Sequence, residues 1–233
     1  MCGRLVASDP AALVEGWSQT RLVPSPADLA ALASYNVSPS QRVLVLRAGP
    51  RGREIAAVRW GLVPAWAKEP LGGRPLFNAR SETAAEKPAF REALRLRRCV
   101  ALADAFYEWK REGRRRVPYR VVTSGVMMLA GVWERWQGPS GEALESAAIL
   151  TRAAGPALRA LHDREPVMFA TREQALGWIA PELRDAVAAL ELLREAGPSV
   201  ELREANAKVG RAGEDGPECL VPGASPGTQL TLC

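Results

Sequence analysis

Short apolar runs separated by polar turns dominate the chain, a pattern typical of a strand-rich domain. Residues 42–47 (RVLVLR) and 54–60 flank the turn-forming segment 49–52 (GPRG), which predicts a β-hairpin. Further strands are predicted at residues 3–7, 99–109, 117–123, 126–136, 145–151 and 200–203. The spacing of the four strands predicted within residues 99–151 favours a meander of antiparallel strands, and such a meander can close into a barrel.

Helical patterns are short and lie outside these strands. Asp9 and Pro10 supply an N-cap residue followed by proline at the first helical position, which predicts a helix start. A second helix is predicted within residues 88–96. Residues 173–195 follow a helical pattern that Pro181 should divide into two helices.

A segment rich in glycine and proline, residues 61–76, interrupts the strands. Loops of this length are usually functional or disordered. Trp66 lies within the segment and residues 77–80 (FNAR) follow it, which argues for an ordered loop. A tryptophan here could stack on a nucleic acid base, as could Trp60, or both could belong to the core.

Length and composition bound the class of protein. With 233 residues, 47% of them hydrophobic, the chain is long enough for one sizeable domain. We expect a domain over residues 2–222 and a C-terminal tail over 223–233 that is rich in Gly and Pro. No apolar run reaches about 18 residues and no signal region is visible, so we expect a cytoplasmic protein without a membrane span.

The charge balance is basic, with a formal net charge of +5, and all but four of the cations are arginine. Arginine suits phosphate binding, but a GC-rich coding sequence would also enrich it. Charge alone therefore does not decide whether the protein binds nucleic acid. Residues 111–116 (REGRRR) concentrate positive charge at a predicted hairpin tip.

The four cysteines show no paired spacing, so neither a metal site nor a disulfide framework is expected. Cys99 lies in an apolar run and is predicted to be buried, whereas Cys219 and Cys233 look incidental. Cys2 differs from the other three because trimming of Met1 would make it the N-terminal residue. It would then carry a thiol beside an α-amine whose pKa lies near 8, a pair that can trap an aldehyde as a thiazolidine. A cysteine at this position can also be accidental.

Two ionisable residues are candidates for acid/base chemistry. His162, the single histidine, lies in a polar segment between apolar flanks, which suggests a surface loop, and it either transfers protons or has no role. Glu108 lies between Tyr107 and Trp109 in a predicted strand. It is either partly desolvated, which would suit it to proton transfer, or turned toward solvent by the alternation of the strand.

Asn78 and Arg80 are candidates for ligand binding, because residues two apart on an extended segment point the same way. An amide beside a guanidinium fits a phosphate and a neighbouring sugar or base edge. The alternative is a loop held by asparagine hydrogen bonds and a surface ion pair.

Several motifs occur together along the chain in a fixed order. They are MCGR (1–4), YNVSP (35–39), RWGLVPAW (59–66), FNARSET (77–83), FYEWK (106–110), AGVWE (130–134) and LHDR (161–164). In this combination the chain resembles the SRAP family, the SOS response-associated peptidases or abasic-site processing proteins, over roughly residues 2–222.

The resemblance implies a compact α+β fold, a distorted antiparallel β-barrel core with flanking helices and a basic groove for single-stranded DNA. It implies that the freed Cys2 attacks the ring-opened sugar of an abasic site and forms a stable thiazolidine DNA–protein crosslink, with weak lyase activity and slow reversal. The expected partner is single-stranded DNA containing an abasic site, bound by a monomer, without a metal or other cofactor.

Residue roles also follow from the resemblance. The expected catalytic residues are Cys2 as nucleophile and Glu108 and His162 as acid/base groups. The expected DNA-binding residues are Arg4, Trp66, Asn78, Arg80, Trp109 and Thr151. Two departures from the family pattern concern Glu165, where an apolar residue is expected before Pro166, and Ala105, where glycine is usual.

Two other functions remain open at this stage. The first is a cysteine peptidase with an N-terminal nucleophile, which removes its own leader. The second is a non-catalytic module that binds single-stranded DNA through tryptophans and arginines. The second gives no necessary role to Cys2, Glu108 or His162.

Overall fold

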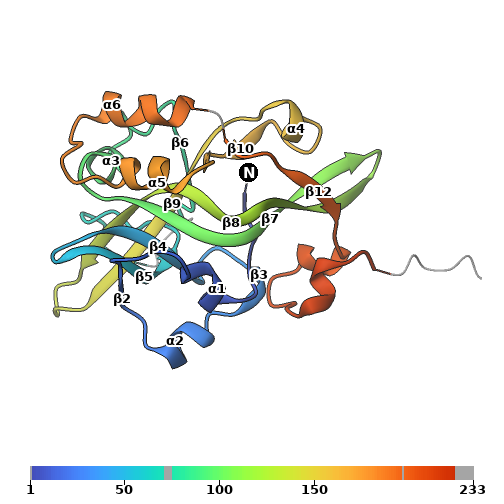
Figure 1. Cartoon of the computed structure of the whole chain (residues 1–233), viewed down its shortest axis with the longest axis horizontal. Helices are drawn as coiled ribbons and strands as arrows, with labels where there is room; N and C mark the ends of the chain where they lie inside the picture. Colours follow the sequence, from blue (N-terminus) through green and yellow to red (C-terminus); the bar gives the residue numbers. More distant parts are fainter. Residues whose placement is uncertain (1, 71–74, 196, 224–233) are drawn as a thin grey trace, which may run out of the picture.

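The computed structural model describes residues 2–70, 75–195 and 197–223. These residues form a strand-rich α/β fold built on one twelve-stranded sheet (Figure 1). The strands are β1 (Leu5–Ala7), β2 (Arg21–Leu22), β3 (Ser34–Val37), β4 (Arg42–Gly49), β5 (Gly52–Trp60), β6 (Asn78–Arg80), β7 (Arg98–Glu112), β8 (Arg115–Gln137), β9 (Ala143–Ala153), β10 (Arg164–Pro166), β11 (Met168–Phe169) and β12 (Glu201–Glu204). The helices are α1 (Pro10–Val14), α2 (Pro26–Ala30), α3 (Arg91–Leu96), α4 (Pro156–Arg159), α5 (Arg172–Trp178) and α6 (Ala186–Glu191), with 3-10 turns η1 (Leu192–Arg194), η2 (Ala207–Gly210) and η3 (Pro217–Leu220).

Five strands form a partial ring in the order β8, β9, β5, β4 and β7, and β7 pairs back to β8. The predicted hairpin is confirmed, because β4 and β5 pair antiparallel up to Gly49 and Gly52. The predicted antiparallel meander is confirmed for β7, β8 and β9, which pair antiparallel in sequence order. The ring is completed through a parallel pair, β5 and β9. These two strands are joined by a long crossover through β6, β7 and β8, and a crossover rather than a hairpin is what a parallel pair requires.

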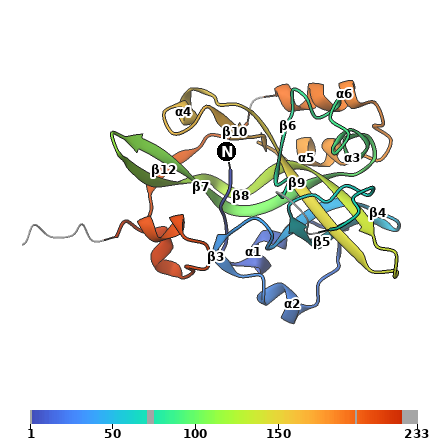
Figure 2. The ribbon, with the colours of Figure 1, turned by 180° about the vertical axis from the view of Figure 1, so that it is seen from behind.

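The strands predicted at 117–123 and 126–136 are one continuous strand, β8. Gly125 between them does not reverse the chain, and β7 pairs with β8 on both sides of it. The pairing register shifts between Ala103 and Ala105, a bulge that bends the long β7–β8 hairpin. Its outer end, residues 110–117, projects beyond the sheet and is called the arm (Figures 1 and 2).

Both faces of the ring are buried. Leu44 and Leu46 belong to a core cluster that also contains Leu94 of α3 and Trp178 of α5, so this face is covered by helices. The alternate residues, such as Val45, belong to a second cluster on the other face. Figure 1 shows α3, α5 and α6 grouped together, away from α1 and α2.

Helix ends largely follow the local sequence. Asp9 accepts hydrogen bonds from two amides in the first turn of α1, as predicted. The segment around Pro181 separates α5 from α6. The helix predicted from residue 88 begins only at Arg91, because a turn precedes it.

Cys99 is buried, as predicted, but Cys219 is not incidental. It is fully buried in a small cluster with Val6 and Tyr107. Cys233 and nearly all of the proposed tail lie outside the described residues. In the part of the chain that the structure describes, the helices are too short or too polar to cross a membrane.

Two glycines on β8 provide a test of packing in the ring. A Cβ at Gly131 would lie 3.0 Å from the carbonyl oxygen of Ala148 and 3.1 Å from Sγ of Cys99, whereas a Cβ at Gly125 would meet nothing within 4 Å. We expect Gly131→Ala to lower the free energy of unfolding by about 1–3 kcal/mol, because overpacking displaces neighbouring strands. Urea denaturation measures the change.

Gly125→Ala is the matched control on the same strand. It should leave stability unchanged or raise it by up to about 1 kcal/mol, because alanine restricts the unfolded chain. Equal effects of the two substitutions would contradict tight packing at Gly131.

Candidate functional site

Cys2 lies just before β1, and its side chain is fully buried (0% exposed) in the same cluster as Val45. Its carbonyl oxygen accepts a hydrogen bond of 2.7 Å from Nδ2 of Asn78 on β6. Burial raises the pKa of the Cys2 thiol well above its ordinary value, and the nearby carboxylate of Glu108 raises it further. The thiol is therefore protonated at neutral pH and needs a base to become a nucleophile.

Pairing of the chain start with β7 brings Cys2 toward Glu108. Leu5 pairs with Phe106, and the amide of Tyr107 donates a hydrogen bond of 3.0 Å to the carbonyl of Arg4. Glu108 itself is 4% exposed, so the alternative in which it faces solvent is wrong. A carboxylate thus lies inside the protein, close enough to the thiol to influence its protonation.

Glu108, Trp109 and His162 line one pocket of about 400 Å³, together with Arg116 and Gly210. His162 follows α4 and precedes β10, and its side chain is 30% exposed, which agrees with the predicted loop position. The pocket therefore combines a buried carboxylate with an imidazole that solvent can reach.

One ring nitrogen of His162 has a partner for each protonation state. Nδ1 lies 2.9 Å from the backbone nitrogen of Arg164, which donates to it, and 2.7 Å from Oδ1 of Asp163. The amide suits a neutral imidazole whose Nδ1 accepts, and the carboxylate suits the protonated imidazolium. Nδ1 therefore has both a hydrogen-bond donor and an acceptor within 3 Å.

A second pocket of about 410 Å³ contains Asn78, Arg80 and Trp66. The side chain of Trp66 is 68% exposed, whereas Trp60 is fully buried and donates from Nε1 to the carbonyl of Phe77 at 2.9 Å. Trp60 therefore belongs to the core and Trp66 is available for stacking. The backbone beside Trp66 is anchored, because Trp136 donates to the carbonyl of Ala67.

Arg4 and Thr151 bond to protein groups behind the pockets. The guanidinium of Arg4 donates to Oδ1 of Asn36 and to the carbonyls of Gly210 and Arg211. Thr151 is fully buried on β9, where it pairs with Arg80 of β6. The structure thus brings together Cys2, Asn78 and Glu108, joins Glu108 with Trp109 and His162, and joins Asn78 with Arg80 and Trp66.

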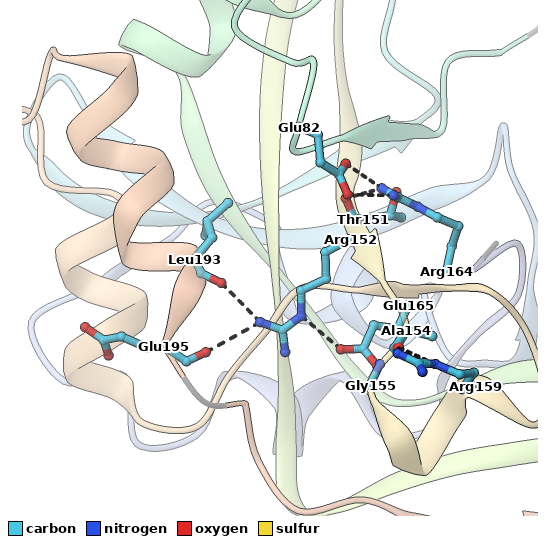
Figure 3. Close-up of polar contacts among 10 residues, drawn as sticks. All are labelled: Glu82, Thr151, Arg152, Ala154, Gly155, Arg159, Arg164, Glu165, Leu193 and Glu195. Carbon is cyan, nitrogen blue, oxygen red and sulfur yellow. Dashed lines mark hydrogen bonds and ion pairs between the residues drawn. The ribbon is translucent and has the colours of Figure 1, made fainter.

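The sequence did not indicate how the loop of His162 is attached to the segment that follows β6. Arg164 forms a two-pronged ion pair with Glu82, with N–O distances of 2.6 and 2.8 Å, and also donates to the carbonyl of Thr151 at 2.7 Å (Figure 3). Arg116 and Lys87, which line the first and second pockets, were also missed as site residues. Nothing in the local sequence marks such partners, because they come from distant segments.

Among the described residues, no group of three or more histidine, cysteine, aspartate or glutamate side chains is arranged to hold a metal ion. The two pockets and their surroundings present a thiol, a carboxylate, an imidazole and several guanidinium groups. The fold and site together define a strand-rich α/β protein with a cysteine at residue 2 beside a buried carboxylate.

Comparison with known proteins identifies the family. The model of the family described as SOS response associated peptidase (SRAP) matches residues 1–212, and the chain belongs to this family. It is 39% identical over 155 residues to the abasic site processing protein YoqW of Bacillus subtilis, covering 65% of this chain and 69% of that protein. It is 32% identical over 231 residues to the abasic site processing protein HMCES of Mus musculus, covering 81% of this chain and 65% of that protein.

Solved structures agree on the fold. A crystal structure of a protein from Bacteroides thetaiotaomicron aligns with a TM-score of 0.80 at 22% identity, covering 95% of this chain and 100% of that one. A phage-related protein of Bordetella bronchiseptica aligns with a TM-score of 0.69 at 25% identity, covering 89% and 95%. The family resemblance drawn from the motifs is confirmed.

The buried thiols predict how stability depends on pH. Burial raises the pKa of Cys2, and raises that of Cys99 to about 12, so both stay protonated in the folded state above about pH 8.5, where unfolded thiols ionise. Their contribution to stability is complete below that pH and is lost as pH rises toward the folded pKa. Between pH 9 and 11 the free energy of unfolding should fall with pH in the parent. We expect Cys2→Ala to make this fall shallower by about 1.4 kcal/mol per pH unit.

Urea denaturation at a series of pH values measures this slope. Cys99→Ala is the matched variant and should flatten it by a similar amount. A Cys2→Ala slope equal to that of the parent would mean that the Cys2 thiol ionises in the folded protein as easily as in the unfolded chain.

Proposed function

We propose that this protein processes abasic sites by forming a thiazolidine crosslink between a freed Cys2 and the ring-opened sugar in single-stranded DNA. The observation that carries the proposal is the approach of the Cys2 thiol to the buried carboxylate of Glu108, with Asn78 bonded to the Cys2 carbonyl. The names of the relatives YoqW and HMCES, both abasic site processing proteins, support the same substrate.

The reaction requires that Met1 be removed, because only then is the nitrogen of Cys2 an amine. The amine adds to the C1′ aldehyde, and loss of one water gives an imine. The thiol sulfur then adds to C1′, its proton passes to the former imine nitrogen, and the five-membered ring closes. Overall the aldehyde and Cys2 combine with loss of one water, and no oxidant or reductant is needed.

Glu108 is assigned the proton transfers at Cys2. Because burial keeps the thiol protonated, sulfur attack needs a nearby base, and Glu108 is the carboxylate that raises the pKa of this thiol. His162, in the same pocket as Glu108, is assigned the proton at the ring oxygen of the sugar, so that the closed hemiacetal opens to the aldehyde. Closure of the thiazolidine diverts the imine from β-elimination, so only weak lyase activity and slow reversal are expected.

The DNA strand is assigned to the surface that joins the two pockets. Asn78 lines the second pocket and also bonds to Cys2, so the two sites are contiguous. Arg80 is exposed at this surface and fits a backbone phosphate, while Trp66 can stack on a base or wedge beside the lesion. Trp109 lines the reaction pocket itself.

Two alternatives make different predictions. An N-terminal-nucleophile peptidase would cleave peptide bonds with Cys2, and a protease assay on denatured protein tests this. A non-catalytic binding module would hold intact and abasic strands equally and would form no covalent product. The burial of Trp60 removes one of the two tryptophans on which that module would depend.

The direct test is incubation of the purified protein, freed of Met1, with single-stranded DNA that contains one abasic site. We expect a crosslink that survives denaturing electrophoresis and a mass equal to protein plus DNA minus one water. Cys2→Ala should abolish the product, because it removes the sulfur that makes the adduct stable.

Rates then separate the acid/base roles. Glu108→Gln and His162→Ala should each slow crosslinking by about 10²-fold or more, the usual contribution of general acid–base catalysis. Glu134→Gln, which alters a buried carboxylate paired with Arg97, is the control and should react at a near-parental rate. A heat-stable adduct with Cys2→Ala would refute the assignment of the nucleophile.

The arm is expected to contribute to DNA affinity. Arg116 at its base lines the reaction pocket, and the single carboxylate of the arm, Glu112, is paired with Lys110 at 2.9 Å. The exposed arginines therefore leave the arm positive beside the site. We expect the double variant Arg111→Gln/Arg114→Gln to lower the salt slope of binding to intact single-stranded DNA by about 1.4, or about 0.7 for each lost phosphate contact.

Fluorescence anisotropy at several salt concentrations measures this slope. The control is Arg51→Gln/Arg184→Gln, which removes the same charge from exposed positions elsewhere and should leave the slope near that of the parent. If both double variants weaken binding equally, net charge rather than the arm determines the affinity.

A further inference from the structure

Glu165 occupies a position where the family resemblance predicts an apolar residue, and it is nevertheless buried (6% exposed). It lies on β10 directly opposite Arg152 on β9. Opposite charges at facing positions of two strands interact directly. An ion pair between a buried carboxylate and a partly buried guanidinium therefore closes the base of the segment between these two strands.

Both oxygens of Glu165 are used (Figure 3). Oε1 lies 2.9 Å from Nε of Arg152, and Oε2 accepts a hydrogen bond of 2.9 Å from the backbone amide of Gly155 at the start of α4. Arg152 also donates from Nη1 to the carbonyls of Leu193 and Glu195. The carboxylate thus links α4 to β9, and Arg152 links β9 to the end of η1.

The segment that these contacts close is residues 154–163, which leads into His162. The amide of Ala154 donates to the carbonyl of Asp163 at 2.9 Å, so the two ends of the segment meet. The amide of His162 in turn donates to the carbonyl of Leu158, one turn after Gly155. A displacement of Gly155 would therefore be transmitted through α4 to the backbone of His162.

We propose that the Arg152–Glu165 pair is a positioning device for His162, acting through Gly155 and α4. It fixes the backbone so that Nδ1 of His162 stays within reach of the amide of Arg164. Only the functional importance of that position rests on the proposed function, because the tie itself concerns the geometry of the loop. Arg152 and Glu165 are positioning residues and do not touch the substrate.

The energetics favour a positioning role over a stabilising one. Removing two charges from water is costly, so a buried ion pair often stabilises a fold no more than apolar residues of similar size. The pair does fix the relative orientation of α4 and β9, because each oxygen of Glu165 accepts from its own donor. An apolar side chain at this position would fill space without holding Gly155.

The single histidine makes a direct test possible. In protein without a histidine tag, the imidazole region of a 15N NMR spectrum recorded above pH 8 observes His162 alone. We expect one fixed tautomer in the parent, with the proton on Nε2, Nδ1 accepting from the Arg164 amide, and the exposed Asp163 carboxylate turned away from the ring. In Glu165→Met the ring should sample both tautomers, and the two nitrogen shifts should move toward each other. Unchanged shifts would overturn the proposal.

A second variant guards against simple unfolding. Glu165→Met alone leaves the partly buried Arg152 without its carboxylate, whereas Arg152→Met/Glu165→Met removes both charges and should recover stability. In the double variant the His162 ring should still sample both tautomers, because the acceptor for the Gly155 amide is gone. Recovery of the parental tautomer in the double variant would overturn the proposal. Glu201→Gln, which breaks an exposed ion pair with Arg203, is the control and should match the parent.

Crosslinking rates supply the functional half of the test. Glu165→Met should react roughly tenfold more slowly at saturating DNA, since small displacements of a catalytic group are costly. In a His162→Ala background the same substitution should have no further effect, because the two act in one chain of contacts. Equal slowing in both backgrounds would overturn the positioning role. If the parent forms no crosslink, the proposed function fails, while the NMR result still decides whether the pair holds His162.

Discussion

The site depends on the pairing of β1 with β7. This short antiparallel contact, in which Leu5 faces Phe106 and the Tyr107 amide bonds to the Arg4 carbonyl, fixes the start of the chain against the strand that carries Glu108. A chain end is ordinarily among the least ordered parts of a domain unless it is tied into a sheet. Here the tie continues beyond β1, because Asn78 holds the Cys2 carbonyl.

Burial then determines the chemistry of the site. Removing Cys2 from water suppresses its ionisation, and the adjacent carboxylate suppresses it further. The thiol is therefore kept neutral until a proton acceptor acts on it, in contrast to cysteines that are activated as stable thiolates. Such a thiol suits a reaction in which an amine attacks first and sulfur follows, because an early thiolate would be exposed to unproductive oxidation.

The sequence predicted those features that depend on neighbouring residues. The β4–β5 hairpin, the Asp9 cap, the division near Pro181 and the burial of Cys99 are confirmed because each is determined within a few residues. The parallel β5–β9 seam and the continuity of β8 were missed, because they depend on which distant strand each segment meets. Composition likewise could not distinguish Trp60 from Trp66, since one is buried by strands that lie far away in sequence.

The same distinction between neighbouring and distant determinants applies to the residues of the site. The motifs identified Cys2, Glu108 and His162 individually, but the contacts that hold the His162 loop come from charged residues that no local pattern marks. Arg164 with Glu82, and Arg152 with Glu165, connect the segment after β6 with β9, β10 and α4. Ion pairs of this kind contribute more to the orientation of side chains than to stability. Proton transfer requires such a fixed orientation. The geometry of the site therefore depends on contacts between segments that lie far apart in the sequence.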